Sequence, residues 1–209
     1  MERVKVGEAR IDAGVLARAA DVLRQGGLVG YPTETFYGIA ADPCDDRAVD
    51  GLFRAKARPL TVPIPLIAGS LDQLVAATGG LPALARDLAW RFWPGPLTLV
   101  IPAWRGLSVA IHGGQGTVAV RVPGHLVARS LCEAFGHPIT STSANLSGDA
   151  PAADADAVTT SLGSSLAMLL DGGRTPGGLS STIVDVVSGA PRLVRPGAIA
   201  WEQVLECLE

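Results

Sequence analysis

Apolar residues recur along this chain with two periods, and the periods divide it into alternating helices and strands. After Asp12, apolar residues return every three or four positions as far as Leu23, and Gly26-Gly27 follow. This pattern is typical of an amphipathic helix with a polar N-cap and a glycine stop. Short runs rich in Val, Ile and Leu lie between such segments and predict buried strands. We expect helices at 12–25, 45–56, 70–77, 84–92, 125–135, 154–161 and 200–208, and strands at 1–6, 28–31, 64–68, 97–101, 117–123, 166–170, 182–187 and 192–195.

Two polar stretches follow predicted strands. Pro32 denies the next ladder bond, so the triplet Thr33-Glu34-Thr35 is expected to leave the sheet as a turn or short helix with free side chains. The alternative is that Thr33 or Thr35 simply caps a helix. The stretch 138–148 begins as a strand and ends in polar or small residues without any charge. Such a loop suits hydrogen bonding to a nucleotide, or else serves only as a Ser/Thr-rich capping loop.

Cations stand at the ends of predicted elements. Lys56 falls in the last turn of a helix, which alone is ordinary dipole complementarity. Arg58 precedes Pro59, which pushes it out of helical geometry, and Arg195 precedes Pro196, which directs it away from the end of a predicted strand. We expect them to join Lys56 and Arg121 as a phosphate clamp.

Two strands carry further information about the sheet. In 117–123 valines alternate with Thr117, Ala119 and Arg121, whose face is either a pocket floor or an exposed sheet face. Pro65 predicts that the strand at 64–68 is an edge strand or contains a bulge.

Composition limits the class of protein. The 209 residues show no shift that would divide them, and 48% are hydrophobic, so one domain with a large core is expected. The net charge of -3 and the pI of about 5.6 argue against a protein that coats nucleic-acid phosphates. There is no signal-peptide pattern and no apolar run of about 20 residues that could span a bilayer, so we expect a soluble protein without membrane contact.

Metal and covalent chemistry are not indicated. Cys44, Cys132 and Cys207 are far apart, which predicts neither a disulfide framework nor a zinc site and favours a reducing cytoplasm. His112, His125 and His137 lack the helical spacing of a metal pair. The chain has no Walker loop and no Gly-x-Ser-x-Gly elbow. The residues alone therefore predict a nucleotide or anion site that positions its substrates.

A series of motifs resembles the YrdC-type family of threonylcarbamoyl-adenylate synthases from about Gly14 to Gly197, in the short bacterial form without an extra C-terminal domain. The motifs are Tyr31-Pro32-Thr33-Glu34-Thr35 with Tyr37-Gly38, Lys56-x-Arg58-Pro59, Trp93-Pro94-Gly95-Pro96-Leu97-Thr98, Arg121-x-Pro123, Ser143-Ala144-Asn145-x-Ser147-Gly148, Ser181-Thr182-Ile183-Val184-Asp185 and Arg195-Pro196-Gly197.

The resemblance implies a fold, a reaction and partners. The fold is a single α/β domain of the YrdC/RibB type, with a twisted mixed sheet, flanking helices and an open concave cavity. The reaction forms threonylcarbamoyl-adenylate and pyrophosphate from L-threonine, bicarbonate and ATP with magnesium. The product would pass to a separate transferase complex that modifies tRNA, so contact with tRNA itself is weak or indirect.

The resemblance also assigns roles to residues. Lys56 and Arg58 would be catalytic, and ATP would be held by Lys56, Arg58, Thr117, Ser141, Ser143, Asn145 and Arg195. L-Threonine would be held by Thr33, Thr35, Arg121 and Ser181, with Arg121 on its carboxylate, and Glu34 is a possible contact for magnesium or the amine. No protein metal site is implied.

Three positions depart from the family pattern. Ile67 replaces a histidine, Ala150-Pro151-Ala152 replaces Ser-Pro-Thr, and Ser180 replaces a glutamate. Two alternatives remain: a module that binds structured RNA, and a paralogue of the same fold that binds RNA or nucleotide without synthase activity.

Overall fold

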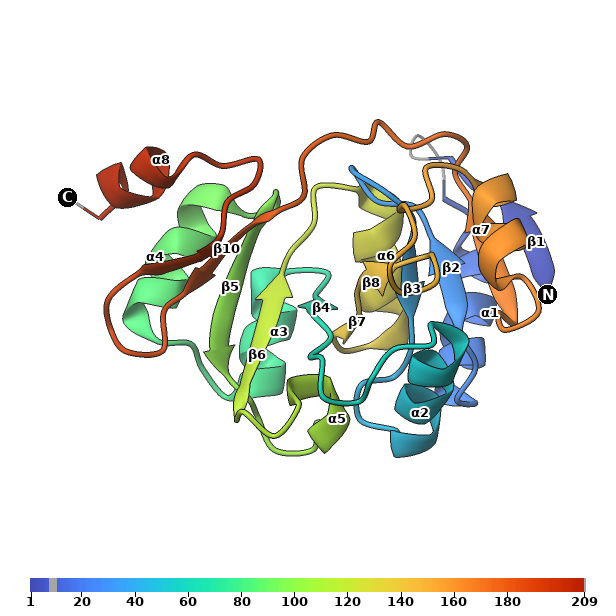
Figure 1. Ribbon diagram of the computed structural model, residues 1–209, viewed down its shortest axis with the longest axis horizontal. Coiled ribbons are helices and arrows are strands. Elements are labelled where there is room, and N and C mark those ends of the chain that lie inside the picture. The colour runs from blue at the N-terminus through green and yellow to red at the C-terminus, as the bar shows by residue number, and fades with distance from the viewer. Residues whose placement is uncertain (8–10, 209) are drawn as a thin grey trace.

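The computed structural model describes residues 1–7 and 11–208, and the helices and strands in that part of the chain form a mixed α/β fold (Figure 1). The helices are α1 Ala13–Arg24, α2 Asp46–Ala55, α3 Leu71–Thr78, α4 Ala83–Phe92, α5 Val109–His112, α6 Leu126–Phe135, α7 Ala155–Leu162 and α8 Trp201–Glu206. The strands are β1 Glu2–Lys5, β2 Val29–Tyr31, β3 Gly38–Ala40, β4 Leu66–Ile67, β5 Leu97–Pro102, β6 Thr117–Arg121, β7 Ile139–Thr140, β8 Thr142–Ser143, β9 Met168–Asp171, β10 Thr182–Asp185 and β11 Arg192–Arg195.

The strands form two mixed sheets. The first has the order β1-β9-β2-β3-β8, in which β1 and β2 run parallel to β9 while β3 is antiparallel to both of its neighbours. The second has the order β11-β10-β5-β6-β4-β7. In Figure 1 the two sheets stand side by side, and the segment between β9 and β10 crosses from one to the other.

One hydrophobic core joins the sheets. Its buried cluster contains Ile39 of β3, Leu66 of β4, Leu99 of β5 and Val120 of β6. A second cluster lies between the first sheet and helices α1 and α6, where Ala19, Leu23 and Leu131 pack together. Burial of these apolar side chains on both sides of the strands stabilises the arrangement.

Polar caps fix the helix starts where the sequence predicts them. The Asp12 carboxylate accepts N–H groups of Gly14 and Val15, and Ser70 and Asp154 cap α3 and α7 in the same way. These bonds satisfy donors that a helix leaves unpaired in its first turn.

Some local predictions are wrong. The strand that follows Pro65 is not at an edge, because β4 lies between β6 and β7. Pro65 precedes its first residue, where the missing N–H leaves the ladder intact. The segment after Pro32 is a turn, as predicted, and only the alternative in which Thr33 caps a helix is wrong: its hydroxyl accepts the N–H groups of Thr35 and Phe36 and closes a turn that leads into β3. Among the described helices, none is long and apolar enough to cross a membrane.

Candidate functional site

A cavity of about 290 Å³ opens between the two sheets. The second sheet provides one side of it, and the turn before β3 together with the segment around β8 provides the opposite side. Of the side chains predicted to form the site, eight line this cavity: Thr33, Thr35, Arg58, Arg121, Ser141, Ser143, Ser181 and Arg195.

Strand register places a row of side chains across the second sheet. Arg195 of β11 is paired with Ile183 of β10, and Ile183 is paired with Thr98 of β5. The β5–β6 register, in which Leu99 faces Val120, brings Thr98 beside Arg121. All four of these residues line the cavity, so the row is its floor and carries a guanidinium at each end.

The guanidinium of Arg195 is fixed at one end of this row. Its Nη2 donates to the carbonyl of Ser181 at 2.8 Å and to the Ser181 hydroxyl at 3.3 Å, and Thr98 donates to the same hydroxyl at 2.8 Å. Burial lowers the pKa of Arg195, and the nearby charge of Arg121 lowers it further. The two arginines therefore create a positive field within the same cavity.

At the other end, Arg121 forms an ion pair with Glu34. Nη1 of Arg121 donates to Oε1 of Glu34, and the two side chains are 10% and 25% exposed. The second carboxylate oxygen, Oε2, is buried and has no hydrogen-bond partner among the described residues. A buried oxygen without a hydrogen-bond partner costs free energy. The carboxylate is therefore held mainly by its ion pair with Arg121.

Lys56 lies behind the cavity wall rather than in it. Only 1% of the residue is exposed, and its Nζ donates to the carbonyls of Ser143 and, at 2.7 Å, of Asn145. The N–H of Ser147 in turn donates to the carbonyl of Lys56 at 2.9 Å. The Lys56-x-Arg58 and Ser143-x-Asn145 motifs are therefore interlocked through the backbone.

Burial, followed by the charge of Arg58, lowers the pKa of Lys56 to about 8. Burial thus makes the Lys56 ammonium less stable than it is in water, although hydrogen bonds to the two carbonyls favour this charged form. At neutral pH the group remains mostly charged.

A left-handed residue directs Arg58 into the cavity. Helix α2 ends with N–H groups of Ala57 and Arg58 bonded to the carbonyls of Arg54 and Phe53, and Ala57 has a φ of 49°. This is a Schellman ending with alanine in the position that usually holds glycine. It turns Arg58 out of the helix, and the guanidinium is then held by the carbonyls of Val62 and Pro63 at 3.2 and 2.9 Å.

Besides Glu34, three predicted site residues do not line the cavity. Lys56 and Asn145 support its wall, and Asn145 donates to the carbonyls of Leu146 and Asp149. Thr117 pairs with Pro102 at the opposite end of β6, about 13 Å from Arg121 at the usual rise along a strand. The face of β6 that carries both Thr117 and Arg121 therefore lines the cavity only at Arg121.

The positions that depart from the family pattern also have definite places. Ile67 is fully buried in the core beside α1 and α6 and does not line the cavity. Pro151 and Ser180 do line it, and the carbonyl of Ala152 accepts the N–H of Tyr37.

Sequence reasoning missed Thr98 and Ile183 as lining residues and the Arg121–Glu34 pair. Alternation along β5 could have placed Thr98 on the face opposite Leu97 and Leu99, but only strand pairing puts it beside Arg121. Gly38 serves another purpose: a Cβ there would lie 2.9 Å from the ring of Tyr31, so glycine makes room for a fully buried tyrosine.

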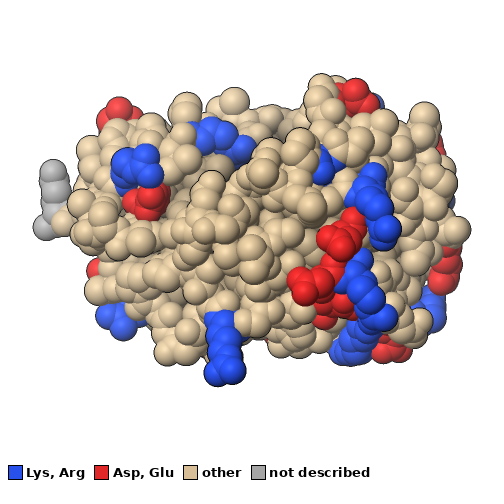
Figure 2. Space-filling model, turned by 60° about the horizontal axis from the view of Figure 1, so that its bottom comes forward, with Lys and Arg blue, Asp and Glu red and all other residues tan. Residues whose placement is uncertain are grey.

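Charge in the site is local. Three guanidinium groups and several hydroxyls line the cavity, whereas its lining among the described residues includes no carboxylate. On the face shown in Figure 2, the basic side chains are scattered among uncharged and acidic ones and form no continuous basic surface. This arrangement suits a small anionic ligand better than a nucleic-acid backbone.

The chain is similar to known proteins in both sequence and structure. Residues 21–197 match the family profile Sua5_yciO_yrdC, which is described as telomere recombination. A Pyrococcus abyssi protein named threonylcarbamoyl-AMP synthase is 40% identical over 195 residues, which cover 93% of this chain and 57% of that protein. A Mycobacterium tuberculosis protein named putative threonylcarbamoyl-AMP synthase is 37% identical over 193 residues, covering 92% of this chain and 88% of that one.

A solved structure agrees with these matches. The crystal structure of P. abyssi Sua5 complexed with L-threonine aligns with a TM-score of 0.90 at 38% identity, covering 99% of this chain and 60% of that one. The chain thus spans a little more than half the length of the Pyrococcus relative. The mixed α/β fold predicted from the sequence is confirmed.

Proposed function

The chain belongs to the Sua5/YciO/YrdC family, as its motif series predicted, and we propose that it is an L-threonylcarbamoyl-adenylate synthase, a nucleotidyltransferase. It would form threonylcarbamoyl-AMP and pyrophosphate from L-threonine, bicarbonate and ATP. The observation that carries this proposal is the cavity in which Arg58, Arg121 and Arg195 converge with hydroxyl groups on both walls. The names of the relatives that cover most of this chain support the same reaction.

Arg121 is the proposed anchor for the carboxylate of L-threonine. A guanidinium binds a carboxylate through two parallel hydrogen bonds, and this one already holds the carboxylate of Glu34. Glu34 therefore occupies the position of a substrate carboxylate and has to move aside or share the arginine when threonine binds. The hydroxyls of Thr33, Thr35 and Ser181 line the same cavity and would orient the rest of the amino acid.

Arg58 and Arg195 are the proposed contacts for the triphosphate of ATP. Both guanidiniums are fixed by backbone carbonyls, so they are oriented before the nucleotide arrives. Ser141 and Ser143 offer hydroxyl and backbone groups beside them. Lys56 and Asn145 would act by holding this wall, since Lys56 is bonded to the carbonyls of Ser143 and Asn145.

The chemistry proceeds without a protein nucleophile. The amine of threonine combines with bicarbonate to give a carbamate and water. A carbamate oxygen then forms a bond to the α-phosphorus of ATP, while the bond from that phosphorus to the bridging oxygen breaks and pyrophosphate leaves. Both reactants are anions, so guanidiniums that neutralise developing charge and align the reactants lower the barrier.

Magnesium fits this site as part of the substrate. Magnesium is usually held by one or two carboxylates together with phosphate oxygens and water. The described lining residues include no carboxylate. Among the described residues, Glu34 is the only acidic residue whose carboxylate forms a hydrogen bond or ion pair with a lining side chain, that of Arg121. The ion would therefore arrive on the ATP phosphates, where it neutralises their charge.

The product would leave for a separate enzyme. Threonylcarbamoyl-adenylate is an activated acyl donor, and a tRNA threonylcarbamoyl transferase complex would consume it. The localised cations of the cavity support a small-molecule site, and tRNA need not contact this chain directly.

Product analysis tests this function. The protein is incubated with ATP, magnesium, bicarbonate and L-threonine, and the adenylate is detected by its mass. Arg58→Ala and Arg195→Ala should each abolish its formation while leaving the protein folded, because both side chains line an open cavity. Arg105→Ala, at an exposed position outside the cavity, is the matched control and should leave the rate unchanged. Undiminished product from both cavity variants would contradict the proposed site.

A further inference from the structure

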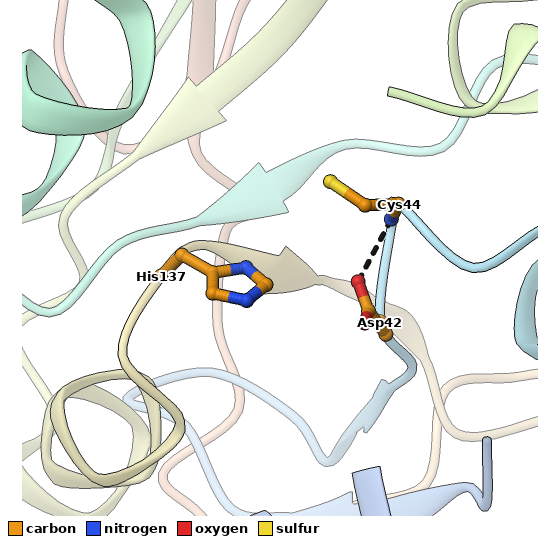
Figure 3. Close-up of side chains that lie close together, drawn as sticks. All are labelled: Asp42, Cys44 and His137. Carbon is orange, nitrogen blue, oxygen red and sulfur yellow. Dashed lines mark hydrogen bonds between the residues drawn. The ribbon is translucent and has the colours of Figure 1, made fainter. Parts of the chain in front are cut away.

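Asp42, Cys44 and His137 form a cluster away from the cavity (Figure 3). One ligand atom from each side chain, a carboxylate oxygen, a thiol sulfur and an imidazole nitrogen, lies within 4.8 Å of the other two. Asp42 and His137 are half-buried and Cys44 is exposed. The two parts of the cluster are far apart in sequence, so no motif along the chain could indicate them.

Pairing between the ends of two strands brings the residues together. The N–H of Thr140 donates to the carbonyl of Ala41 at 3.2 Å, and the N–H of Ala41 donates to the Thr140 hydroxyl at 2.8 Å. These bonds place the segment that follows β3 beside the segment that leads into β7. Asp42 and Cys44 come from the first segment and His137 from the second.

Contacts with the rest of the chain hold the Asp42 carboxylate, the His137 ring and the loop before any ion binds. Oδ1 of Asp42 accepts the N–H of Cys44 at 2.8 Å, which fixes the carboxylate next to the cysteine. The His137 ring packs against the ring of Phe135, with centroids 4.3 Å apart. The carbonyl of Pro43 accepts the N–H of Ser108 at 2.9 Å and so anchors the loop from the other side. Ligands oriented by such outer contacts bind a metal more tightly.

No cation in the described part of the chain forms an ion pair with the Asp42 carboxylate. In that part of the chain, the only hydrogen bond that its side chain makes is the one it accepts from the N–H of Cys44. A divalent cation would complete the cluster by charge as well as by ligand type.

The cluster is separate from the proposed catalytic site. None of its residues lines the cavity. The cavity is lined by Gly38, which lies at the opposite end of β3 from Asp42. Asp42 comes four positions after Gly38, which corresponds to about 13 Å where the chain is extended. An ion bound here would not contact ATP or threonine.

We propose that Asp42, Cys44 and His137 bind one zinc ion, with water as the fourth ligand. Zinc accepts sulfur, nitrogen and oxygen donors in a tetrahedron, and three protein ligands with one open position are a common arrangement. Donors that share a zinc ion stand about 3.3 to 3.8 Å apart, because each lies about 2.0 to 2.3 Å from it. The donor atoms lie within 4.8 Å of one another, so they have to approach each other by at most about 1.5 Å to reach this spacing.

Zinc binding exchanges the S–H bond of Cys44 for a sulfur–zinc bond and changes no oxidation state. The thiol of Cys44 gives its proton to solvent, and its sulfur forms the bond to zinc. The ion then joins the loop after β3 to the residue that leads into β7. Its expected effect is on stability, because it would bind the folded chain and not the separated segments.

Metal titration tests the proposal. The protein is treated with a chelator, dialysed and titrated with cobalt, whose bond to a thiolate produces a charge-transfer absorption in the near ultraviolet. We expect one cobalt per chain with this absorption, and displacement by zinc. Zinc should also raise the melting temperature of the chelator-treated protein.

Variants identify the ligands. Cys44→Ser should remove the charge-transfer absorption, and His137→Gln and Asp42→Asn should each weaken zinc binding about 10-fold or more. Asp42→Asn retains Oδ1 as an acceptor for the N–H of Cys44, so it removes the charge and keeps the turn. Cys207→Ser and His112→Gln are the matched controls, since neither residue belongs to the cluster.

Three results would overturn the proposal: no stoichiometric binding to the wild-type protein, cobalt absorption that survives Cys44→Ser, or zinc affinity unchanged in both His137→Gln and Asp42→Asn. Circular dichroism of each variant without metal distinguishes a lost ligand from a lost fold.

Discussion

Replacing Lys56 by methionine should change how stability depends on pH. The side chain is 1% exposed, and its pKa is lowered from 10.5 to about 8 by burial and by Arg58. Between these two values the unfolded chain holds a proton that the folded chain releases. Stability therefore rises as pH increases through this window, and the contribution is absent below about pH 7, where both states are protonated.

The size of the effect follows from the pKa change. At about 1.4 kcal/mol per pH unit, the full shift corresponds to about 3 kcal/mol. About 2 kcal/mol of this should appear between about pH 7 and about pH 9.5, before the window closes. Tyrosine and cysteine side chains whose pKa is raised by burial act in the opposite direction at higher pH. The comparison of variant with wild type cancels their contribution.

Urea denaturation measures this directly. Free energies of unfolding are determined at several pH values for the wild type, Lys56→Met and Lys5→Met. Lys5 is the other lysine of the chain and is exposed on β1, so Lys5→Met controls for the loss of one positive charge. The wild type should gain about 2 kcal/mol relative to Lys56→Met across the range. If the free energies of unfolding of the wild type and Lys56→Met depended on pH in the same way, the idea that burial destabilises the Lys56 ammonium would be refuted.

Three further changes test the site and its support. Glu34→Gln removes the carboxylate that occupies Arg121, so the KM for L-threonine should fall by about 3- to 10-fold, because the competing ion pair is lost; a higher KM would mean that Glu34 contacts the substrate. Ala57→Gly relieves a left-handed alanine and should raise the free energy of unfolding by about 0.5 to 1 kcal/mol, whereas destabilisation would contradict the Schellman ending. Gly38→Ala brings a Cβ to 2.9 Å from the Tyr31 ring and should cost about 1 to 3 kcal/mol of stability; a neutral result in denaturation would show that the ring has room to move.

Local chemistry explains why most elements could be predicted from the sequence. Helix starts are set by residues such as Asp12 and Ser70, whose side chains bond to amides two or three positions away. Such information lies within a few residues of each boundary. Strand β3 was not foreseen, because three residues after a polar turn carry too little pattern, and its existence depends on pairing with β2 and β8.

The site could be predicted in its parts but not in its geometry. A proline after a helix, a proline after a strand and a hydroxyl-rich loop indicated where Arg58, Arg195 and Ser143 would be released toward a ligand. Whether such groups meet depends on strand register, which is set by contacts between distant segments. Register explains why Arg121 lies in the cavity and Thr117 does not, although both were expected on one face.

Burial accounts for a second difference between the predicted site and the observed one, the role of Lys56. The sequence indicates that Lys56 is a cation near a ligand, yet the structure uses its Nζ to hold the backbone of Ser143 and Asn145. A lysine pattern cannot distinguish these roles, since the length of the side chain allows either. The same holds for the Asp42, Cys44 and His137 cluster, whose members are joined only by tertiary structure.

The most direct test of the central claim is the rate of pyrophosphate release from ATP in the presence of magnesium and bicarbonate, measured with and without L-threonine and with L-serine in its place. The proposed function predicts release that depends on threonine, exceeds the rate with serine, and is lost in Arg121→Ala because the carboxylate anchor is removed. Release that is independent of amino acid, or no release with either amino acid, would contradict the synthase assignment and leave the cavity as an anion pocket of another kind.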